Sequence, residues 1–228
     1  MTAKDVRPRV AIVDFGLGNL YSVARACAHV GLEPVVTASR ADLSAAQGII
    51  LPGVGAFGDA MASLERLDLA GILRDAALAD KPLLGVCLGV QLLMSRSEEF
   101  GSHRGLDILK GSVVRFEHPR EGEGMLKIPQ IGWNGIFRVR SAGGGDPWTG
   151  SPLEGQRDGE PMYFVHSYYV QPQEEAVILS TTRYGQIEFC SSVRVRRVFA
   201  CQFHPERSGP AGLRIYEKFG SWLRPGPI

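Results

Sequence analysis

Hydrophobic and polar positions alternate along the first half of the chain in a way that predicts strands and helices in turn. Short apolar runs, each followed by apolar residues at helical spacing, recur up to about the middle of the chain. This alternation is typical of a parallel sheet with both faces covered. The expected strands are residues 9–14, 34–37, 48–51 and 83–86, and the expected helices are residues 20–30, 59–79 and a segment from Leu88 that includes Gln91, Leu92 and Met94.

The second half has a different pattern, in which turn residues separate several strand-like segments and helix signals are few. This pattern predicts hairpins and a mixed sheet. The expected strands are residues 112–116, 135–139, 162–170, 177–182, 187–193 and 198–203, and the expected closing helix is 211–222, with Pro225 beyond its end. We therefore expect an α/β fold with a mostly parallel central sheet flanked by helices and an added antiparallel or mixed sheet.

Composition limits the possible functions and the number of domains. The 228 residues suit a single domain over 1–228, with a polar start at 1–8 and a loop at 143–152. A net charge of +1 gives no electrostatic reason to expect binding to nucleic acid or to an anionic membrane. No leader or spanning segment is visible, which predicts a cytoplasmic protein. Four cysteines without metal-binding spacing predict no metal site: Cys27, Cys87, Cys190 and Cys201.

Cys87 is the most informative residue of the chain. It lies where the buried strand 83–86 meets the helical pattern that begins at Leu88, in the arrangement Gly-x-Cys-x-Gly formed with Gly85 and Gly89. Small residues on both sides allow the sharp strand-to-helix turn that exposes a nucleophile. The helix start favours the thiolate over the thiol. A buried apolar cysteine is the commoner fate of a free thiol, but the paired glycines and the turn favour a nucleophile here.

A second segment supplies a candidate base. The strand 198–203 leads into His204, and Glu206 follows two residues later, after Pro205. A cysteine nucleophile needs a base that takes and returns a proton, and the base needs a group that fixes its tautomer. A structural histidine beside a solvated glutamate would give the same short motif. This segment therefore indicates a catalytic base only in combination with the turn at Cys87.

A third segment offers backbone donors for an oxyanion. The buried strand 48–51 runs into the glycine-rich turn Pro52-Gly-Val-Gly55. Acyl transfer forms a tetrahedral oxyanion that aimed backbone N–H groups stabilise, and we expect Val54, Gly55 and Leu88 to provide them. An ordinary strand-to-helix connection is the alternative for this turn. All three segments follow strands of a parallel sheet, so they should meet at one edge.

Together these motifs resemble the class I, or triad, glutamine amidotransferases. Within that family the chain is most similar to the glutaminase subunits of imidazole glycerol phosphate synthase, a flavodoxin-like group. The resemblance covers nearly the whole chain in the expected order, and Gly-Trp-Asn and Tyr-Phe-Val-His-Ser-Tyr are its most specific parts. The matching segments are residues 13–20, 51–61, 127–134, 163–168 and 202–208.

The resemblance implies specific roles. It makes Cys87, His204 and Glu206 a catalytic triad that hydrolyses glutamine to glutamate and ammonia without a cofactor. It implies a heterodimer with a (β/α)8-barrel cyclase, which uses the ammonia to make imidazole glycerol phosphate and an aminoimidazole carboxamide ribotide in histidine biosynthesis. The implied glutamine-binding residues are Gly53, Gln91, Ser167 and Tyr168, and the implied cyclase contacts are Leu17, Gly18, Asn19, Trp133, Asn134, Tyr163 and Arg207.

Some features depart from the family pattern, and two other functions stay open. Gln130 stands where the family often has histidine, Arg207 stands where lysine is common, and residues 141–148 suggest an enlarged surface loop. The alternatives are the glutaminase subunit of another synthase and, from a different class, a non-catalytic thiol sensor on a similar fold. Without the resemblance, Gln91 would be an exposed helix residue, and Ser167 and Tyr168 would be ordinary strand residues.

Overall fold

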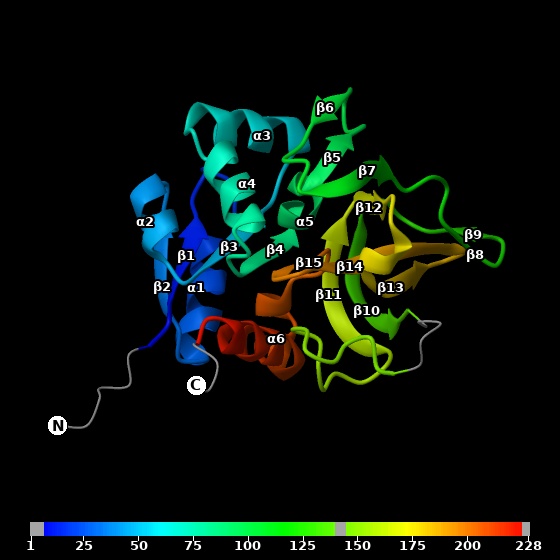
Figure 1. Ribbon diagram of the computed structural model, residues 1–228. Coiled ribbons are helices and arrows are strands. Elements are labelled where there is room, and N and C mark those ends of the chain that lie inside the picture. The colour runs from blue at the N-terminus through cyan, green and yellow to red at the C-terminus, as the bar shows by residue number, and fades with distance from the viewer. Residues whose placement is uncertain (1–6, 140–144, 225–228) are drawn as a thin grey trace.

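The computed structural model describes residues 7–139 and 145–224, so the start of the chain, part of the loop at 141–148 and Pro225 lie outside the described residues. Its main feature is a thirteen-stranded mixed sheet (Figure 1). Five neighbouring strands run parallel in the order β2-β1-β3-β4-β15. They are β1 (Arg9–Val13), β2 (Glu33–Thr37), β3 (Gly48–Gly53), β4 (Leu83–Cys87) and β15 (Val198–Cys201).

The antiparallel part begins at β15, which is parallel to β4 on one side and antiparallel to β14 on the other. From β14 the sheet continues through β12 and β7 to β5 and β6, and a branch runs through β13 and β10 to β11. The strands are β5 (Met94–Ser97), β6 (His103–Arg104), β7 (Leu109–Arg115), β10 (Gln130–Arg138), β11 (Glu160–His166), β12 (Tyr168–Pro172), β13 (Ile178–Tyr184) and β14 (Ile187–Val195), with a separate hairpin of β8 (Arg120–Glu121) and β9 (Gly124–Met125).

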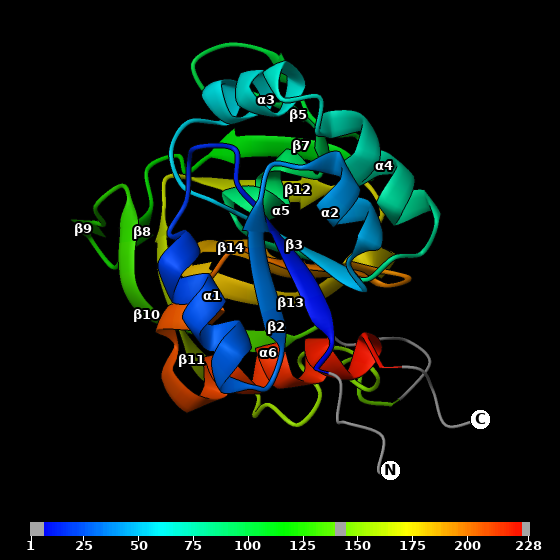
Figure 2. The same cartoon turned by 90° about the vertical axis from the view of Figure 1, so that its left-hand side faces the viewer.

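Helices cover both faces of the parallel strands (Figure 2). One buried apolar cluster packs α2, α3 and α4 on one face, and a second packs α1 and α6 on the other. The expected α/β class, with a mostly parallel sheet, flanking helices and an added mixed sheet, is therefore confirmed. The helices are α1 (Leu20–His29), α2 (Arg40–Ala45), α3 (Phe57–Arg66), α4 (Ala70–Leu78), α5 (Leu88–Leu92) and α6 (Gly209–Trp222), with short 3₁₀ turns η1 (Glu175–Val177) and η2 (Pro205–Arg207).

Three expected elements differ from the observed ones. The single helix expected at 59–79 is two helices, because the chain turns at Asp68, whose φ is +55°. The helix after Cys87 ends at Leu92, and Met94 begins β5 instead of extending the helix. The strand expected at 162–170 is interrupted at Ser167, between β11 and β12.

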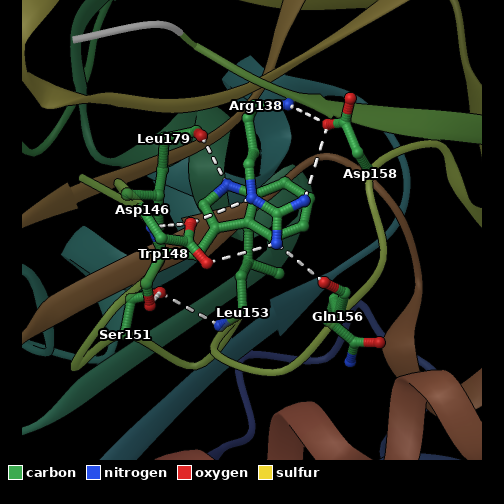
Figure 3. Close-up of polar contacts among 8 residues, drawn as sticks. All are labelled: Arg138, Asp146, Trp148, Ser151, Leu153, Gln156, Asp158 and Leu179. Atoms are coloured by element: carbon green, nitrogen blue, oxygen red, sulfur yellow. Dashed lines mark hydrogen bonds and ion pairs between the residues drawn. The ribbon is translucent and has the colours of Figure 1, made fainter. Parts of the chain in front are cut away.

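The end of the loop at 141–148 is not a free surface segment, since Trp148 is fully buried. Its indole N–H donates a hydrogen bond to the Leu179 carbonyl oxygen at 2.7 Å, and the Arg138 guanidinium lies 4.0 Å from the ring centroid (Figure 3). The Asp146 carboxylate accepts a 2.9 Å hydrogen bond from Arg138 Nε. These contacts attach the segment to β10 and β13.

Candidate functional site

Three neighbouring parallel strands bring the predicted chemistry to one edge of the sheet. Gly53 at the end of β3 is the register partner of Cys87 at the end of β4, and Cys201 at the end of β15 pairs with Val86. A pocket of about 280 Å³ opens at this edge. Its lining residues are Val54, Gly55, Cys87, Leu88, Gln91, Glu99, Pro129, Val165, His166, Ser167 and Tyr168.

The turn at Cys87 is sharp, and the two glycines beside it are required by close packing. Cys87 has φ +54° and ψ −110°, a conformation that residues with side chains rarely adopt. A Cβ placed on Gly89 would lie 1.9 Å from the Leu51 carbonyl oxygen, and one on Gly85 would lie 2.8 Å from the Ala200 Cβ. Both distances are too short for a side chain, so the chain can make this turn only with glycine on each side.

His204 and Glu206 form a buried pair beyond the end of β15. His204 Nδ1 lies 2.8 Å from Glu206 Oε1, and the two side chains are 4% and 1% exposed. Burial lowers the pKa of His204, but the charge and hydrogen bonding of Cys87 and Glu206 outweigh it and raise the pKa to about 10. The raised pKa favours the protonated imidazole, with Glu206 at Nδ1, while Nε2 is buried without a hydrogen-bond partner among the described residues.

The turn after β3 lies against the start of α5. A Cβ on Gly53 would lie 3.1 Å from the Phe15 ring and 3.1 Å from the Leu88 Cβ, so this residue is tightly enclosed. Gly55 has φ +107°, which favours glycine, and its neighbour Val54 is 41% exposed. The structure thus brings Val54, Gly55 and Leu88 to the same pocket as Cys87, and their role as oxyanion donors stays a prediction.

Three of the four expected glutamine-binding residues, Gln91, Ser167 and Tyr168, line this pocket. Gln91 is buried, which excludes the alternative of an exposed helix residue, and its Nε2 donates hydrogen bonds to the Tyr168 carbonyl oxygen at 3.0 Å and to Gln202 Oε1 at 3.1 Å. Ser167 and Tyr168 line the pocket at the break between β11 and β12. Gly53 is buried against Leu88, and its contact with glutamine stays a prediction.

Both the sequence and the fold have known relatives. Residues 11–221 match the family "glutamine amidotransferase class-I". The chain belongs to this family. The imidazole glycerol phosphate synthase subunit HisH of Moorella thermoacetica is 44% identical over 219 residues, covering 96% of this chain and 97% of that protein. The protein of the same name from Aquifex aeolicus is 44% identical over 212 residues, covering 92% and 95%.

Solved structures agree on the fold of this amidotransferase. PurLQS from Thermotoga maritima superposes with a TM-score of 0.71 at 20% identity, covering 96% of this chain and 100% of that one. A structure described simply as a glutamine amidotransferase gives a TM-score of 0.68 at 18% identity, covering 93% and 98%. At such identities these likenesses support the architecture alone, whereas the HisH relatives confirm the resemblance found in the sequence.

The predicted partner contacts of the amidotransferase gather beside the pocket. Trp133 is 59% exposed and meets the Tyr163 ring edge-on at 6.1 Å between centroids. The Arg207 guanidinium lies 5.0 Å from the Tyr163 centroid, and the Tyr163 carbonyl oxygen accepts a 2.9 Å hydrogen bond from the His204 N–H. This aromatic group is therefore connected to the candidate base through the backbone.

The remaining predicted contacts lie in the loop between β1 and α1 and at Asn134 in β10. Leu17 and Asn19 are partly exposed in the loop between β1 and α1, and a Cβ on Gly18 would lie 4.0 Å from the Gly53 Cα. The loop therefore adjoins the glycine-rich turn. Asn134 is different, because its side-chain amide donates a 2.6 Å hydrogen bond to the Arg183 carbonyl oxygen within the sheet.

Sequence reasoning missed several residues of the site. His166 lines the pocket, and burial lowers its pKa to about 4, so the ring is neutral and its Nδ1–H can donate to the Tyr168 carbonyl oxygen at 2.9 Å. Gln202 is fully buried with its Nε2 at 3.7 Å from the Cys87 sulfur. Glu99 also lines the pocket, and its Oε2 accepts a 2.6 Å hydrogen bond from the Phe57 N–H. Gln202 lies two residues before His204, in the segment 202–208 that resembles the family. This position was the sequence signal that could have identified it as a site residue.

Within residues 7–139 and 145–224, no three His, Cys, Asp or Glu side chains are grouped so that they could hold a metal ion. No helix in this described part of the chain is long and apolar enough to cross a membrane.

Proposed function

We propose that this amidotransferase is the glutaminase subunit of imidazole glycerol phosphate synthase and that Cys87, His204 and Glu206 are its catalytic triad. One observation carries the assignment of the triad. Cys87 and His204 follow the neighbouring parallel strands β4 and β15, and Glu206 Oε1 lies 2.8 Å from His204 Nδ1. The 44% identity to HisH proteins over almost the full chain supports the choice of synthase.

The first half-reaction follows from the positions of these groups. The Cys87 sulfur attacks the side-chain amide carbon of glutamine and forms a tetrahedral intermediate. Backbone N–H groups of Leu88 and of the Val54–Gly55 turn hold its oxyanion. His204 gives its proton to the leaving nitrogen, the C–N bond breaks, and ammonia departs from a γ-glutamyl thioester.

The second half-reaction restores the enzyme. The neutral His204 removes a proton from water, and the resulting hydroxide attacks the thioester carbon. The C–S bond breaks, glutamate leaves, and Cys87 is again a thiolate beside a protonated imidazole. Glu206 fixes the tautomer of His204 and stabilises its positive charge in both steps. The substrate contacts come from Gly53, Gln91, Ser167 and Tyr168.

The ammonia passes to a (β/α)8-barrel cyclase that docks beside the pocket. The exposed Trp133 and the stack of Tyr163 with Arg207 provide the aromatic and cationic anchors that are common in interfaces. We propose a heterodimer, a cytoplasmic location, and a single domain over residues 1–228. The further contacts in this proposal are Leu17, Gly18, Asn19 and Asn134.

The test is Cys87→Ala, assayed together with the cyclase of an imidazole glycerol phosphate synthase. Glutamine-dependent turnover should vanish, while synthesis from added ammonium salt should persist because ammonia does not need the thiol. Cys190→Ala is the matched control, since Cys190 is buried in β14 and outside the pocket. Glutamine-dependent turnover that survives Cys87→Ala would reject the nucleophile, and absence of glutamine-dependent synthesis by the wild-type chain with an ammonia-active cyclase would reject the partner.

A further inference from the structure

A row of buried amides connects the substrate-binding strand to the nucleophile. The Tyr168 carbonyl oxygen accepts a 3.0 Å hydrogen bond from Gln91 Nε2. The same nitrogen lies 3.1 Å from Gln202 Oε1, and Gln202 Nε2 lies 3.7 Å from the Cys87 sulfur. Gln202 is fully buried and Gln91 is 5% exposed, so water does not compete for these contacts.

The backbone carbonyl at Tyr168 fixes the direction of the whole row. A carbonyl oxygen only accepts, so the Gln91 atom that faces it must be the NH₂ group. That group has a second N–H, which requires an oxygen on the facing side of Gln202. The other atom of the Gln202 amide, which faces the sulfur, is then nitrogen. Rotating either amide by 180° would place two acceptors or two donors against each other.

We propose that Gln202 is a further catalytic residue, which donates an N–H hydrogen bond to the Cys87 sulfur and stabilises it as a thiolate, and that Gln91 orients it. The proposal rests on the proposed function, in which Cys87 is the nucleophile. It leaves Gln91 among the proposed glutamine contacts, since this residue also lines the pocket. The NH₂ group of Gln91 donates hydrogen bonds to the Tyr168 carbonyl oxygen and to Gln202 Oε1.

The other contact of the sulfur shows why a donor matters. Cys87 Sγ lies 3.9 Å from the Val165 carbonyl oxygen, which can accept a hydrogen bond only from the thiol form. Gln202 acts in the opposite direction, since an N–H can stabilise the thiolate. His204 favours the thiolate through its positive charge. The sulfur therefore faces one hydrogen-bond acceptor, on β11, and one donor, from Gln202 at the end of β15.

The titratable groups around the Cys87 sulfur keep their charge states over the pH range of the experiment described below. Burial raises the pKa of Cys201 well above its usual range, while burial lowers that of His166 to about 4, so both stay neutral between pH 6 and 9. The charged groups that remain nearby are His204 with its partner Glu206, and Glu99 on the pocket wall. Gln202→Met changes none of them, because it replaces an uncharged amide with an uncharged side chain of similar length.

The experiment measures alkylation of Cys87 by iodoacetamide against pH in the full chain, with the modified peptide quantified by mass spectrometry. In Gln202→Met, the pH of half-maximal alkylation should rise by about one unit, as expected for the loss of one charge-assisted hydrogen bond. In the presence of the cyclase, kcat for glutamine hydrolysis should fall roughly tenfold to hundredfold. KM should stay within about threefold, because the donor acts on the nucleophile and not on bound glutamine.

Gln156→Met is the matched control, since Gln156 is 3% exposed, donates to the Ala211 carbonyl oxygen and does not line the pocket. It should leave the alkylation profile unchanged. If Gln202→Met does not fold, Gln91→Met provides the test, because loss of the orienting group should shift the profile in the same direction by a smaller amount. An unshifted profile in a folded Gln202 or Gln91 variant would overturn the proposal. Cys87→Ala distinguishes failure of the Gln202 proposal from failure of the proposed function. Only an active Cys87→Ala enzyme would reject the proposed function itself.

Discussion

Gly89 is the residue whose replacement tests the turn at Cys87 most directly. A Cβ at this position would lie 1.9 Å from the Leu51 carbonyl oxygen, whereas ordinary van der Waals contact begins near 3.4 Å. In Gly89→Ala, α5 must therefore retreat from β3 by about 1.5 Å. Leu51 is fully buried in β3, so neither backbone has free space to move into.

The size of the effect follows from this displacement. Overpacking of a dense core costs about 1–3 kcal/mol of unfolding free energy, and each kcal/mol lowers Tm by roughly 2–4 °C in a chain of this length. The larger consequence concerns catalysis, since Cys87 and Leu88 belong to the same turn. A misplacement of about 1 Å at a reacting centre can cost roughly 10²-fold in rate. We therefore expect Gly89→Ala to lower Tm by several degrees and to lower glutaminase kcat by about 10²-fold.

The assay compares calorimetric Tm and glutamate release, with the cyclase present, for wild type, Gly89→Ala and Gly71→Ala. Gly71 lies in the first turn of α4, and a Cβ there would meet nothing within 4 Å. Gly71→Ala should keep its activity and gain up to about 1 kcal/mol of stability. A Gly89→Ala enzyme with wild-type Tm and kcat would refute the packing argument. A lowered Tm with unchanged kcat would show that the position of Cys87 does not depend on this contact.

Further predictions concern the triad, the thiols and the glycine-rich turn. His204→Ala should be nearly as damaging to glutamine hydrolysis as Cys87→Ala, and Glu206→Gln milder. Glu206→Gln should also lower the pKa of His204, because a carboxylate that raises this pKa is removed; an NMR titration of His204 is the measurement, and an unchanged pKa would contradict the pairing. A glutamine-analogue electrophile at pH 8 should label Cys87 alone, with protection by glutamine, because burial keeps the other three thiols protonated; labelling elsewhere by mass spectrometry would speak against this. The isolated chain should release glutamate slowly and be activated by a ligand-bound cyclase, and Gly55→Val should uncouple activity from that ligand, because one oxyanion donor is worth roughly 10²–10³-fold in rate; equal rates for chain, complex and ligand-bound complex would reject the switch.

Strand positions were the most predictable part of the fold. Apolar runs at 48–51 and 83–86 mark strands β3 and β4, because a parallel strand buried on both faces must be apolar almost throughout. The division between α3 and α4 was missed although the apolar spacing changes there, since Leu64 and Leu69 are five residues apart, whereas Leu69 and Leu73 are four apart, as on one helix face. Only the left-handed backbone of Asp68 separates the two helices, and aspartate is not a strong signal for it.

Some residues of the candidate site could be predicted from the sequence, and others could not. Cys87, His204 and the turn at 52–55 could be located because each follows a predicted strand, and strand ends of a parallel sheet converge. The amide row could not be predicted, because the direction of Gln91 and Gln202 depends on a carbonyl of β12, which is far away in the sequence. The burial of Trp148 was missed for the same reason, since its partner Leu179 belongs to another strand.

The position of β15 between β4 and β14 determines the order in which the site can be assembled during synthesis. The ribosome releases the strand that ends in Cys87 long before it releases residues 198–204. Until then β4 has an open edge, and the thiol has no imidazole beside it. A chain that ends before residue 198 would thus carry the proposed nucleophile without its proposed base, so that glutamine is spared until residues 198–206 have been made.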